Sequence, residues 1–308
     1  MSRAAVIGLY LGLVVIWSST WVAIKIGLED CPPLLGAGIR FAVAGLVLLA
    51  FAAASGRPLR TDARLAAILA LMPFALAYGL VYWGEQHIPS GLAAVLFGVL
   101  PLYTAFLGAV FLPDQPLRIR LVVGILIAIG GLALAFAESA DSGDPELALL
   151  GAAALAVAPL GASVGNISLK LRAGQLDAVA LNGWGMLGGG LLLLVASGIG
   201  ESWGEAAWTA ESVGSIAYLA LIGSAVPFVA LTVLLRHISA QAMSFLAMLL
   251  PFGALLFGAA LYSEAITTRA LAGAALVAAG LLVAQAAPPR RGMPKSLGVR
   301  PREIRVRD

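Results

Sequence analysis

The sequence has few charged residues and a single cysteine, and each shortage excludes one structural feature. Charged residues make up 11% of the 308 residues, and 61% are hydrophobic. A soluble protein has about 25% charged residues, so this chain cannot cover a water-facing surface and lipid must be its solvent. Cys31 is the single cysteine, which excludes an intramolecular disulfide. The sequence also lacks a phosphate-binding loop, an H-E-x-x-H motif and a cysteine cluster, so we expect no cofactor and no metal.

The apolar runs have the length of membrane-spanning helices. Backbone groups in lipid must hydrogen-bond within their own segment, and runs of about 20 residues suit helices, not strands. We therefore predict an all-α membrane protein with ten transmembrane helices. The predicted spans are 5–27, 33–54, 65–85, 90–111, 119–137, 147–169, 178–198, 213–235, 239–261 and 269–287.

Basic residues set the predicted orientation. With the N-terminus in the cytoplasm, 16 of the 19 Lys and Arg residues fall on the cytoplasmic side, in line with the positive-inside rule. Both termini are therefore predicted to be cytoplasmic. The basic tail could bind anionic lipid or nucleic acid, but a disordered anchor is the simpler interpretation, and we expect no nucleic acid partner.

Two stretches of the chain resemble each other. His87-Ile88 aligns with His237-Ile238, and Leu100-Pro101 with Leu250-Pro251. Over residues 87–132, 12 positions are identical, where about five are expected by chance. Five spans is an odd number, so the two repeats must have opposite orientations in the membrane. We predict a first five-helix repeat over residues 1–137, an inverted second repeat over 138–287 and a disordered basic tail over 288–308.

An inverted repeat indicates a function. It is the common plan of secondary transporters, whose substrate site lies near the midplane between the halves. A duplication without a transport role is the alternative.

Polar and aromatic side chains inside the spans are the candidates for this site, because such groups usually face a cavity or a partner. An aromatic cavity with few charges suits neutral, partly apolar solutes. An interfacial aromatic belt is the alternative for the outer rings, and packing for the deeper ones. The predicted substrate-binding residues are Trp17, Ser18, Thr20, Tyr78, Tyr82, Tyr103, Ser163, Asn166, Trp184 and Ser244.

Three charged residues lie in the outer half of the predicted spans. Lys25 either snorkels to the surface or binds a substrate carboxylate. Arg40 lies deeper and needs a partner, for which Glu85 is the candidate in a structural ion pair. With Glu85 held ionised by Arg40, no residue is available to exchange a proton between the two faces. This predicts a facilitator that moves solute down its own gradient, unless Glu85 reaches the cavity.

Prolines mark possible bends. Pro101 and Pro251 are equivalent in the repeat and lie close to the midplane, so they are the predicted hinges. Packing kinks that do not move are the alternative.

Signals for an enzyme are weak. Residues 161–165 match G-x-S-x-G, but they lie inside a predicted span, where the required strand-to-helix turn cannot form. We predict that the chain is not an enzyme; an intramembrane enzyme is the remote alternative.

Several motifs resemble one family. They are Trp17-Ser18-Ser19-Thr20 with Lys25, Arg40-Phe41-Ala42, and the two prolines followed by Asp114 and Glu264 at the next turns. The chain resembles the EamA-type family of the drug/metabolite transporter superfamily, which usually has Glu at both turns, so Asp114 is a departure. The resemblance implies a ten-span exporter of small metabolites, driven by a proton gradient or by the solute itself.

Within the superfamily, the chain is most similar to bacterial aromatic and neutral amino-acid exporters. We therefore expect an alternating-access exporter or facilitator of small neutral metabolites, including aromatic amino acids, in the bacterial inner membrane. Its expected partners are a small-molecule substrate and the lipid bilayer. The oligomeric state stays open, with a monomer as one option. A proton-coupled exporter of drugs or purines is the alternative.

Overall fold

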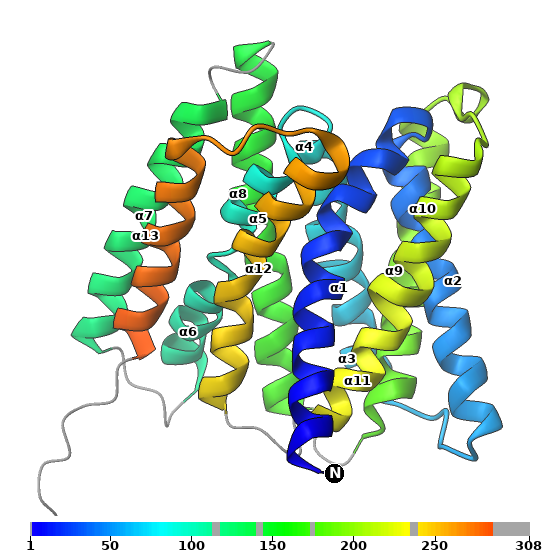
Figure 1. Cartoon of the computed structure of the whole chain (residues 1–308). Coiled ribbons are helices and arrows are strands. Elements are labelled where there is room, and N and C mark those ends of the chain that lie inside the picture. The colour runs from blue at the N-terminus through cyan, green and yellow to red at the C-terminus, as the bar shows by residue number, and fades with distance from the viewer. Residues whose placement is uncertain (1, 113–117, 140–143, 173–175, 235–239, 286–308) are drawn as a thin grey trace, which may run out of the picture.

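The computed structural model of the chain is a bundle of helices over the residues that it describes, 2–112, 118–139, 144–172, 176–234 and 240–285 (Figure 1). Eight segments of this part are long and apolar enough to cross a membrane. Two more apolar helices are shorter, Ile119–Ala135 and Leu249–Tyr262. The predicted all-helical membrane fold is confirmed, and the count of ten spans stays a prediction.

The chain divides by sequence into two stretches, called here the first half (α1 to α7) and the second half (α8 to α13). The first half contains α1 (Arg3–Asp30), α2 (Pro33–Ala54), α3 (Ala63–Leu69), η1 (Ala70–Ala77), α4 (Tyr78–Glu85), α5 (Ser90–Phe97), α6 (Leu100–Phe111) and α7 (Ile119–Ser139). The second half contains α8 (Pro145–Arg172), α9 (Ala178–Gly200), η2 (Trp203–Glu205), α10 (Ala210–Ala220), η3 (Leu221–Ala225), α11 (Val226–Leu234), α12 (Ala240–Tyr262) and α13 (Thr268–Gln285).

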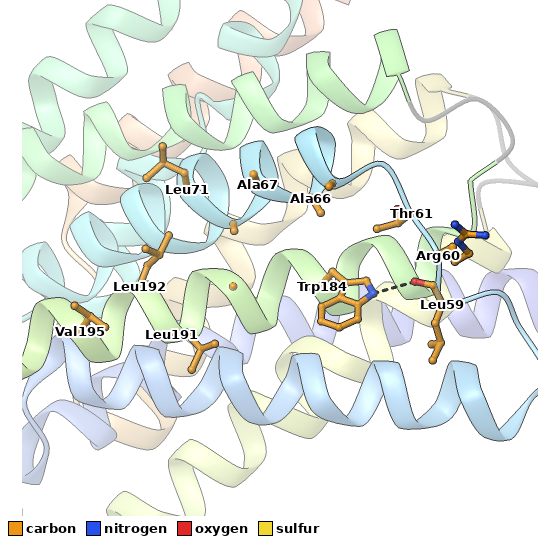
Figure 2. A pocket seen from close by; sticks show the side chains of 13 residues that line it. Leu59, Arg60, Thr61, Ala66, Ala67, Leu71, Trp184, Leu191, Leu192 and Val195 are labelled. Atoms are coloured by element: carbon orange, nitrogen blue, oxygen red, sulfur yellow. Dashed lines mark hydrogen bonds between the residues drawn. The ribbon is translucent and has the colours of Figure 1, made fainter.

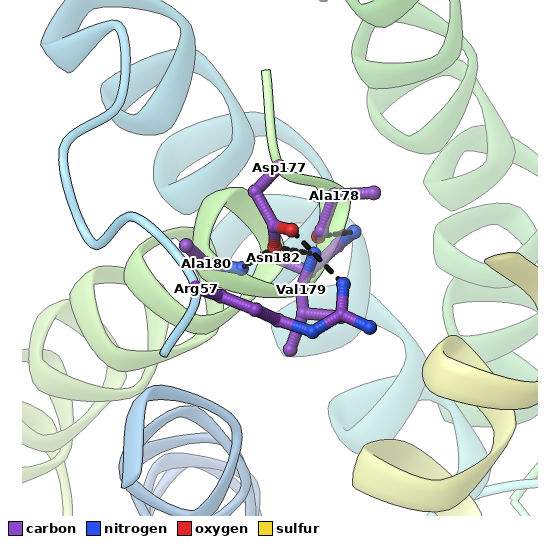
Figure 3. Close-up of polar contacts among 6 residues, drawn as sticks. All are labelled: Arg57, Asp177, Ala178, Val179, Ala180 and Asn182. Carbon is purple, nitrogen blue, oxygen red and sulfur yellow. Dashed lines mark hydrogen bonds and ion pairs between the residues drawn. The ribbon is translucent and has the colours of Figure 1, made fainter. Parts of the chain in front are cut away.

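Short polar residues start several of these helices. The Asp177 carboxylate accepts hydrogen bonds from the N–H groups of Val179 (2.9 Å) and Ala180 (3.0 Å), which caps α9 (Figure 3). The same carboxylate pairs with Arg57 at 3.0 Å, and this contact ties the start of α9 to the chain that follows α2. Asp62 caps α3 in the same way, through the N–H groups of nearby residues.

Three prolines lie at or next to interruptions of a helix. Pro73 lies inside η1, a π-helical stretch, where the wider turn tolerates the missing N–H of proline. Pro227 is the second residue of α11, which begins directly after η3, the π-helical stretch of the second half. Pro101 lies in the first turn of α6, just after the helix is interrupted between α5 and α6. Pro251 and Pro159, in contrast, lie inside the continuous helices α12 and α8.

Glycines allow two helix pairs to pack closely across the halves, and α7 and α13 lie side by side in Figure 1. On α2 and α9, a Cβ at Gly45 would lie 2.7 Å from the Gly183 oxygen, and a Cβ at Gly190 would lie 2.8 Å from the Gly38 oxygen. Neither contact leaves room for a side chain, so the backbones touch directly. The two contacts are reciprocal, because Gly38 and Gly45 have the same spacing as Gly183 and Gly190.

The pair α7 and α13 repeats this pattern. A Cβ at Gly131 would lie 2.7 Å from the Gly273 oxygen, and Gly124 and Gly280 approach each other in the same reciprocal way. Each pair therefore crosses as if a two-fold axis ran between its helices.

The end of the bundle at which α1 begins also holds the end of α13 (Figure 1), and it is called the N-terminal end here. At the opposite end, carboxylates from one segment cap the helices of another. Glu264 accepts hydrogen bonds from the N–H groups of Ser90 (2.7 Å) and Gly91 (3.1 Å) at the start of α5. Glu201 does the same for Leu34 (2.7 Å) and Leu35 (3.0 Å) at the start of α2. Acids at these positions also suit the positive end of each helix dipole.

Candidate functional site

Aromatic rings from both halves form a connected cluster in the middle of the bundle. The Phe41 ring on α2 lies 4.6 Å from the Tyr78 ring and 5.3 Å from the Phe74 ring, centroid to centroid. Phe74 continues to Phe228 on α11 (6.0 Å), and Phe228 continues to Trp17 on α1 (6.4 Å). Trp17 and Tyr78, both predicted site residues, are thus joined through three phenylalanines. Such a wall suits an apolar or aromatic group.

Arg40 lies against this cluster and connects the two halves. Its side chain is 2% exposed. Nε donates to the Ser224 hydroxyl on η3 (3.1 Å), and Nη1 donates to the Tyr82 hydroxyl on α4 (3.4 Å). The guanidinium carbon lies 4.8 Å from the Phe41 ring centre and 5.0 Å from that of Tyr78. The cation is therefore enclosed by two hydroxyls and two rings.

The expected ion pair between Arg40 and Glu85 is not formed, and this corrects the sequence analysis. Within the described part of the chain, no acid lies within 4.0 Å of the guanidinium. Tyr82, one turn before Glu85 on the same helix, takes the place expected for the acid. The Glu85 side chain is fully enclosed, and neither carboxyl oxygen has a hydrogen-bond partner.

Lys25 makes contacts that the sequence analysis did not expect. Its ammonium donates to the backbone oxygens of Glu85 (2.6 Å) and Ile88 (3.0 Å), and more weakly to that of Gln86 (3.4 Å). These carbonyls lie at the end of α4, where a helix lacks internal partners and a cation is favourable. Lys25 therefore caps α4 from α1.

Two buried serines make equivalent contacts in opposite directions. Ser18 on α1 donates to the Leu250 carbonyl on α12 at 3.3 Å. Ser163 on α8 donates to the Leu100 carbonyl on α6, also at 3.3 Å. Each acceptor directly precedes one of the predicted hinge prolines. Each half therefore supplies the serine in one contact and the carbonyl in the other, so the two contacts are equivalent when the halves are swapped. The glycine contacts have the same property.

The other predicted polar residues fall into two groups. Thr20 bonds within α1, to the Trp17 carbonyl at 2.7 Å. On the α6–α8 side, the Thr104 hydroxyl donates to Ser163 (3.1 Å), and the Asn166 amide donates to Thr104 (3.4 Å). Tyr103, beside Thr104, is half-buried and packs against the main apolar core. This second group is separate from Arg40.

Trp184 lies apart from these groups, at the periphery of the helix bundle. It is 42% exposed, and its indole N–H donates to the Leu59 carbonyl at 3.0 Å. It borders a surface groove of about 1010 Å³ between the α3–η1 segment and α9 (Figure 2). The groove is lined mainly by apolar side chains, among them Leu71, Leu191 and Val195. Ser244 belongs to α12, but its side chain lies outside the described residues.

Comparison with known proteins decides the family. The sequence model that describes the EamA-like transporter family matches residues 4–137 and 149–285. The chain belongs to the EamA-like transporter family. The resemblance predicted from the motifs is confirmed, and the chain is a multi-span membrane transporter.

Two relatives of this EamA-like chain are also named as transporters. The uncharacterized inner membrane transporter YedA of Escherichia coli (strain K12) is 32% identical over 258 residues, which cover 81% of this chain and 80% of YedA. The uncharacterized transporter YoaV of Bacillus subtilis (strain 168) is 28% identical over 248 residues, 80% of this chain and 84% of YoaV. A protein of known crystal structure shares the fold with a TM-score of 0.67 at 19% identity, over 92% of this chain and 97% of that one.

Sequence reasoning missed part of the candidate site in this EamA-like transporter. Phe228 could have been found, since the shift that aligns His87 with His237 also aligns Tyr78 with Phe228. No pattern in the sequence indicates that Ser224 approaches Arg40, because that contact depends on how η3 packs against α2. The described residues contain no group of three His, Cys, Asp or Glu side chains arranged to hold a metal ion.

Proposed function

We propose that this EamA-like transporter is an alternating-access carrier for small neutral metabolites, amino acids with aromatic side chains included. It exports them across the bacterial inner membrane through a central site between two inverted five-helix repeats, residues 1–137 and 138–287. Residues 288–308 form a cytoplasmic tail. The observation that carries the proposal is that each half makes the same kinds of contact to the other half.

Equivalent contacts at three places support inverted repeats: the two serine contacts, the crossing of α2 with α9 and the crossing of α7 with α13. The contacts from Ser18 to Leu250 and from Ser163 to Leu100 are related by swapping the halves. The glycine contacts of α2 with α9, and of α7 with α13, are reciprocal in the same sense. The family model also matches the chain twice, once in each half. Carriers of this plan bind solute where the repeats meet, and the repeats rock around that site.

The arrangement of the ends supports ten spans with both termini in the cytoplasm. The start of α1 and the end of α13 share one end of the bundle, as an even number of crossings requires (Figure 1). Arg57 and Arg60 lie between α2 and α3 at that end, and Arg64 lies in the first turn of α3. The positive-inside rule assigns such basic loops to the cytoplasm.

The surroundings of the aromatic cluster support the solute class. Five rings from both halves face one another beside a single enclosed arginine. An apolar wall with one charge favours a solute that is mostly apolar and neutral overall.

Solute flux with purified protein tests the proposal. Proteoliposomes would be loaded with L-phenylalanine, L-leucine, adenine or glucose, and release would be measured against protein-free liposomes. We expect release of the amino acids. Trp17→Ala should slow it about tenfold, since the cluster loses a ring, while the matched change at the 57% exposed Trp208 should not. Release of no solute, or equal slowing by both variants, would contradict the proposal.

Energy coupling leaves two candidates. The facilitator is the simpler one, but it assumed that Arg40 holds Glu85 in an ion pair, and that pair is not formed. An enclosed carboxyl group with no hydrogen-bond partner favours proton coupling, because its charge is costly there and can change as the protein moves. An imposed pH gradient without a solute gradient separates the two. A facilitator gives no accumulation, whereas a proton-coupled carrier gives accumulation that Glu85→Gln abolishes.

A further inference from the structure

Among the residues that the structure describes, the buried cation Arg40 has no direct counter-ion. Its hydrogen-bond partners are the hydroxyls of Ser224 and Tyr82, both neutral groups, and its two ring neighbours are neutral as well. Glu85 interacts with it only through space. Burying a guanidinium is expensive, and hydroxyls and ring faces neutralise none of its charge. A buried guanidinium without a counter-ion is stabilised when it binds an anion.

Arg40 lies where the two halves meet, and carriers built from inverted repeats bind their solute at such a junction. One hydrogen bond joins it to the first half and the other to the second, so its surroundings must change when the halves move. Ser224 belongs to η3, and Tyr82 follows closely after η1, the two π-helical interruptions of the bundle. Interrupted helices at the junction of the halves are typical of solute sites in transporters.

The chemistry of the guanidinium selects the anion. Its planar fork binds a carboxylate through two parallel hydrogen bonds, and a carboxylate is a stronger partner than a hydroxyl. The bond to Tyr82, at 3.4 Å, is long for an N–H···O contact and can be given up. The rings of Phe41 and Tyr78 would then meet the apolar part of the same solute.

We propose that Arg40 anchors the carboxylate of the transported solute. This rests on the proposed function and narrows its substrates to solutes with a carboxylate group, such as zwitterionic amino acids. Amines, alcohols and nucleobases of the same size bind weakly.

A matched pair of probes tests the anchor. L-phenylalanine and L-phenylalaninol have the same side chain and amine, and differ in the carboxylate that phenylalaninol replaces by a hydroxymethyl group. Their Kd values would be measured by titration calorimetry on purified protein in detergent. We expect the wild-type chain to bind L-phenylalanine about a hundredfold more tightly, since a site built for a polar group rejects the analogue that lacks it.

Variants at Arg40 should change this ratio, which does not depend on how much of a preparation is folded. Arg40→Gln should make the two Kd values nearly equal by weakening L-phenylalanine alone. Arg40→Lys keeps the charge but not the planar fork, so the ratio should fall to about tenfold. Arg57→Gln, at a partly exposed arginine of the N-terminal end, should leave the ratio unchanged. If Arg40→Gln does not fold, the result with Arg40→Lys decides.

Equal binding of both probes by the wild-type chain would overturn the anchor, and so would an unchanged ratio in both Arg40 variants. Neither result would affect the transporter itself if release of other solutes persists in proteoliposomes. Failure to release any solute would instead refute the proposed function.

Discussion

The two halves share their scaffold but not their polar chemistry. Both contribute a buried serine that bonds the other half, and both contribute paired glycines at the crossing of α2 with α9. Arg40 has no such counterpart. The offset that pairs Gly38 with Gly183 places Gly185 opposite it, and Gly185 packs against Leu69 and Phe74.

This difference separates two kinds of constraint. Under the proposed mechanism, a feature present in both halves belongs to the parts that rearrange equivalently when the carrier changes the side to which it opens. A feature present once, such as Arg40 with Tyr82 or the enclosed Glu85, belongs under the same proposal to the chemistry of a single solute site. Changing one member of a duplicated pair should therefore have the same effect as changing the other.

The largest effect, which should be the same for both members of the pair, is expected where the glycines of α2 and α9 meet. Gly45→Leu and Gly190→Leu each place a side chain against backbone of the other helix, so α2 and α9 must separate. We expect each variant to lose about 3 kcal/mol or more of stability, or to aggregate on extraction. Thermal unfolding in detergent measures this.

Gly8→Leu is the control for that pair, because a Cβ at Gly8 meets nothing within 4 Å. It should unfold like the wild-type chain. A large effect at Gly45 with none at Gly190 would contradict the reciprocal crossing.

The next effect concerns transport. Pro101→Ala adds a backbone N–H in the first turn of α6, and Pro251→Ala adds one inside α12, each next to one of the serine contacts. As changes at the proposed hinges, each should slow L-phenylalanine release about tenfold while its Kd stays the same. Pro159, inside α8, has no equivalent in the other half, so Pro159→Ala should slow release much less. Wild-type release by the double variant of Pro101 and Pro251 would exclude a hinge at either position.

A smaller effect is expected at the serines. Ser18→Ala and Ser163→Ala each remove one interhelical hydrogen bond, which contributes about 1 kcal/mol. The loss should be slightly larger for Ser163, because the Thr104 hydroxyl also loses its acceptor. Unfolding of the single and double variants should give nearly additive losses, since the two sites share no partner. A loss confined to one serine would argue against equivalent halves.

The smallest effect is expected at Asp177, at the N-terminal end (Figure 3). Burial acts to raise the pKa of Asp177, but hydrogen bonds from Ala180, Arg57 and Val179 together outweigh it, so the pKa lies below its ordinary value. A lowered pKa adds stability above the unfolded value of about 3.9, and the gain is lost as pH falls through the folded value.

Asp177→Asn keeps a capping side chain and removes this charge. It should therefore lower the stability at pH 7 slightly, by less than about 1 kcal/mol, and this difference should disappear as pH falls through the lowered pKa of the folded state. Added salt should reduce the difference at pH 7. A difference that grows on acidification would have the wrong sign for this account.

The spans could be predicted because their length and apolar character are local properties of the sequence. The predicted span 33–54 coincides with α2, and the predicted span 178–198 ends two residues before α9 does. The breaks were less predictable. Pro73 indicates a disturbed helix, but nothing local distinguishes a π-helical stretch from a kink.

The site was harder to predict for the same reason. Trp17 and Tyr78 could be selected as deep aromatic residues, and they do join one cluster. Trp184 has the same character in the sequence, yet its helix turns it outward. The partners of Arg40 and the cap that Glu264 forms on α5 come from distant segments, so only the packing of the whole chain reveals them.

Alternating access to the aromatic cluster is the central claim, and thiol labelling from each side of the membrane tests it most directly. Cys31 would first be changed to Ser, although it should react slowly, because burial, with Glu201 and Asp30 nearby, raises its pKa to about 11. Tyr78→Cys would then be exposed to a membrane-impermeant reagent in right-side-out and in inside-out vesicles. We predict labelling from both sides and protection by L-phenylalanine in each case. Labelling from neither side, or labelling that the solute leaves unchanged, would contradict a solute site that opens alternately to the two faces.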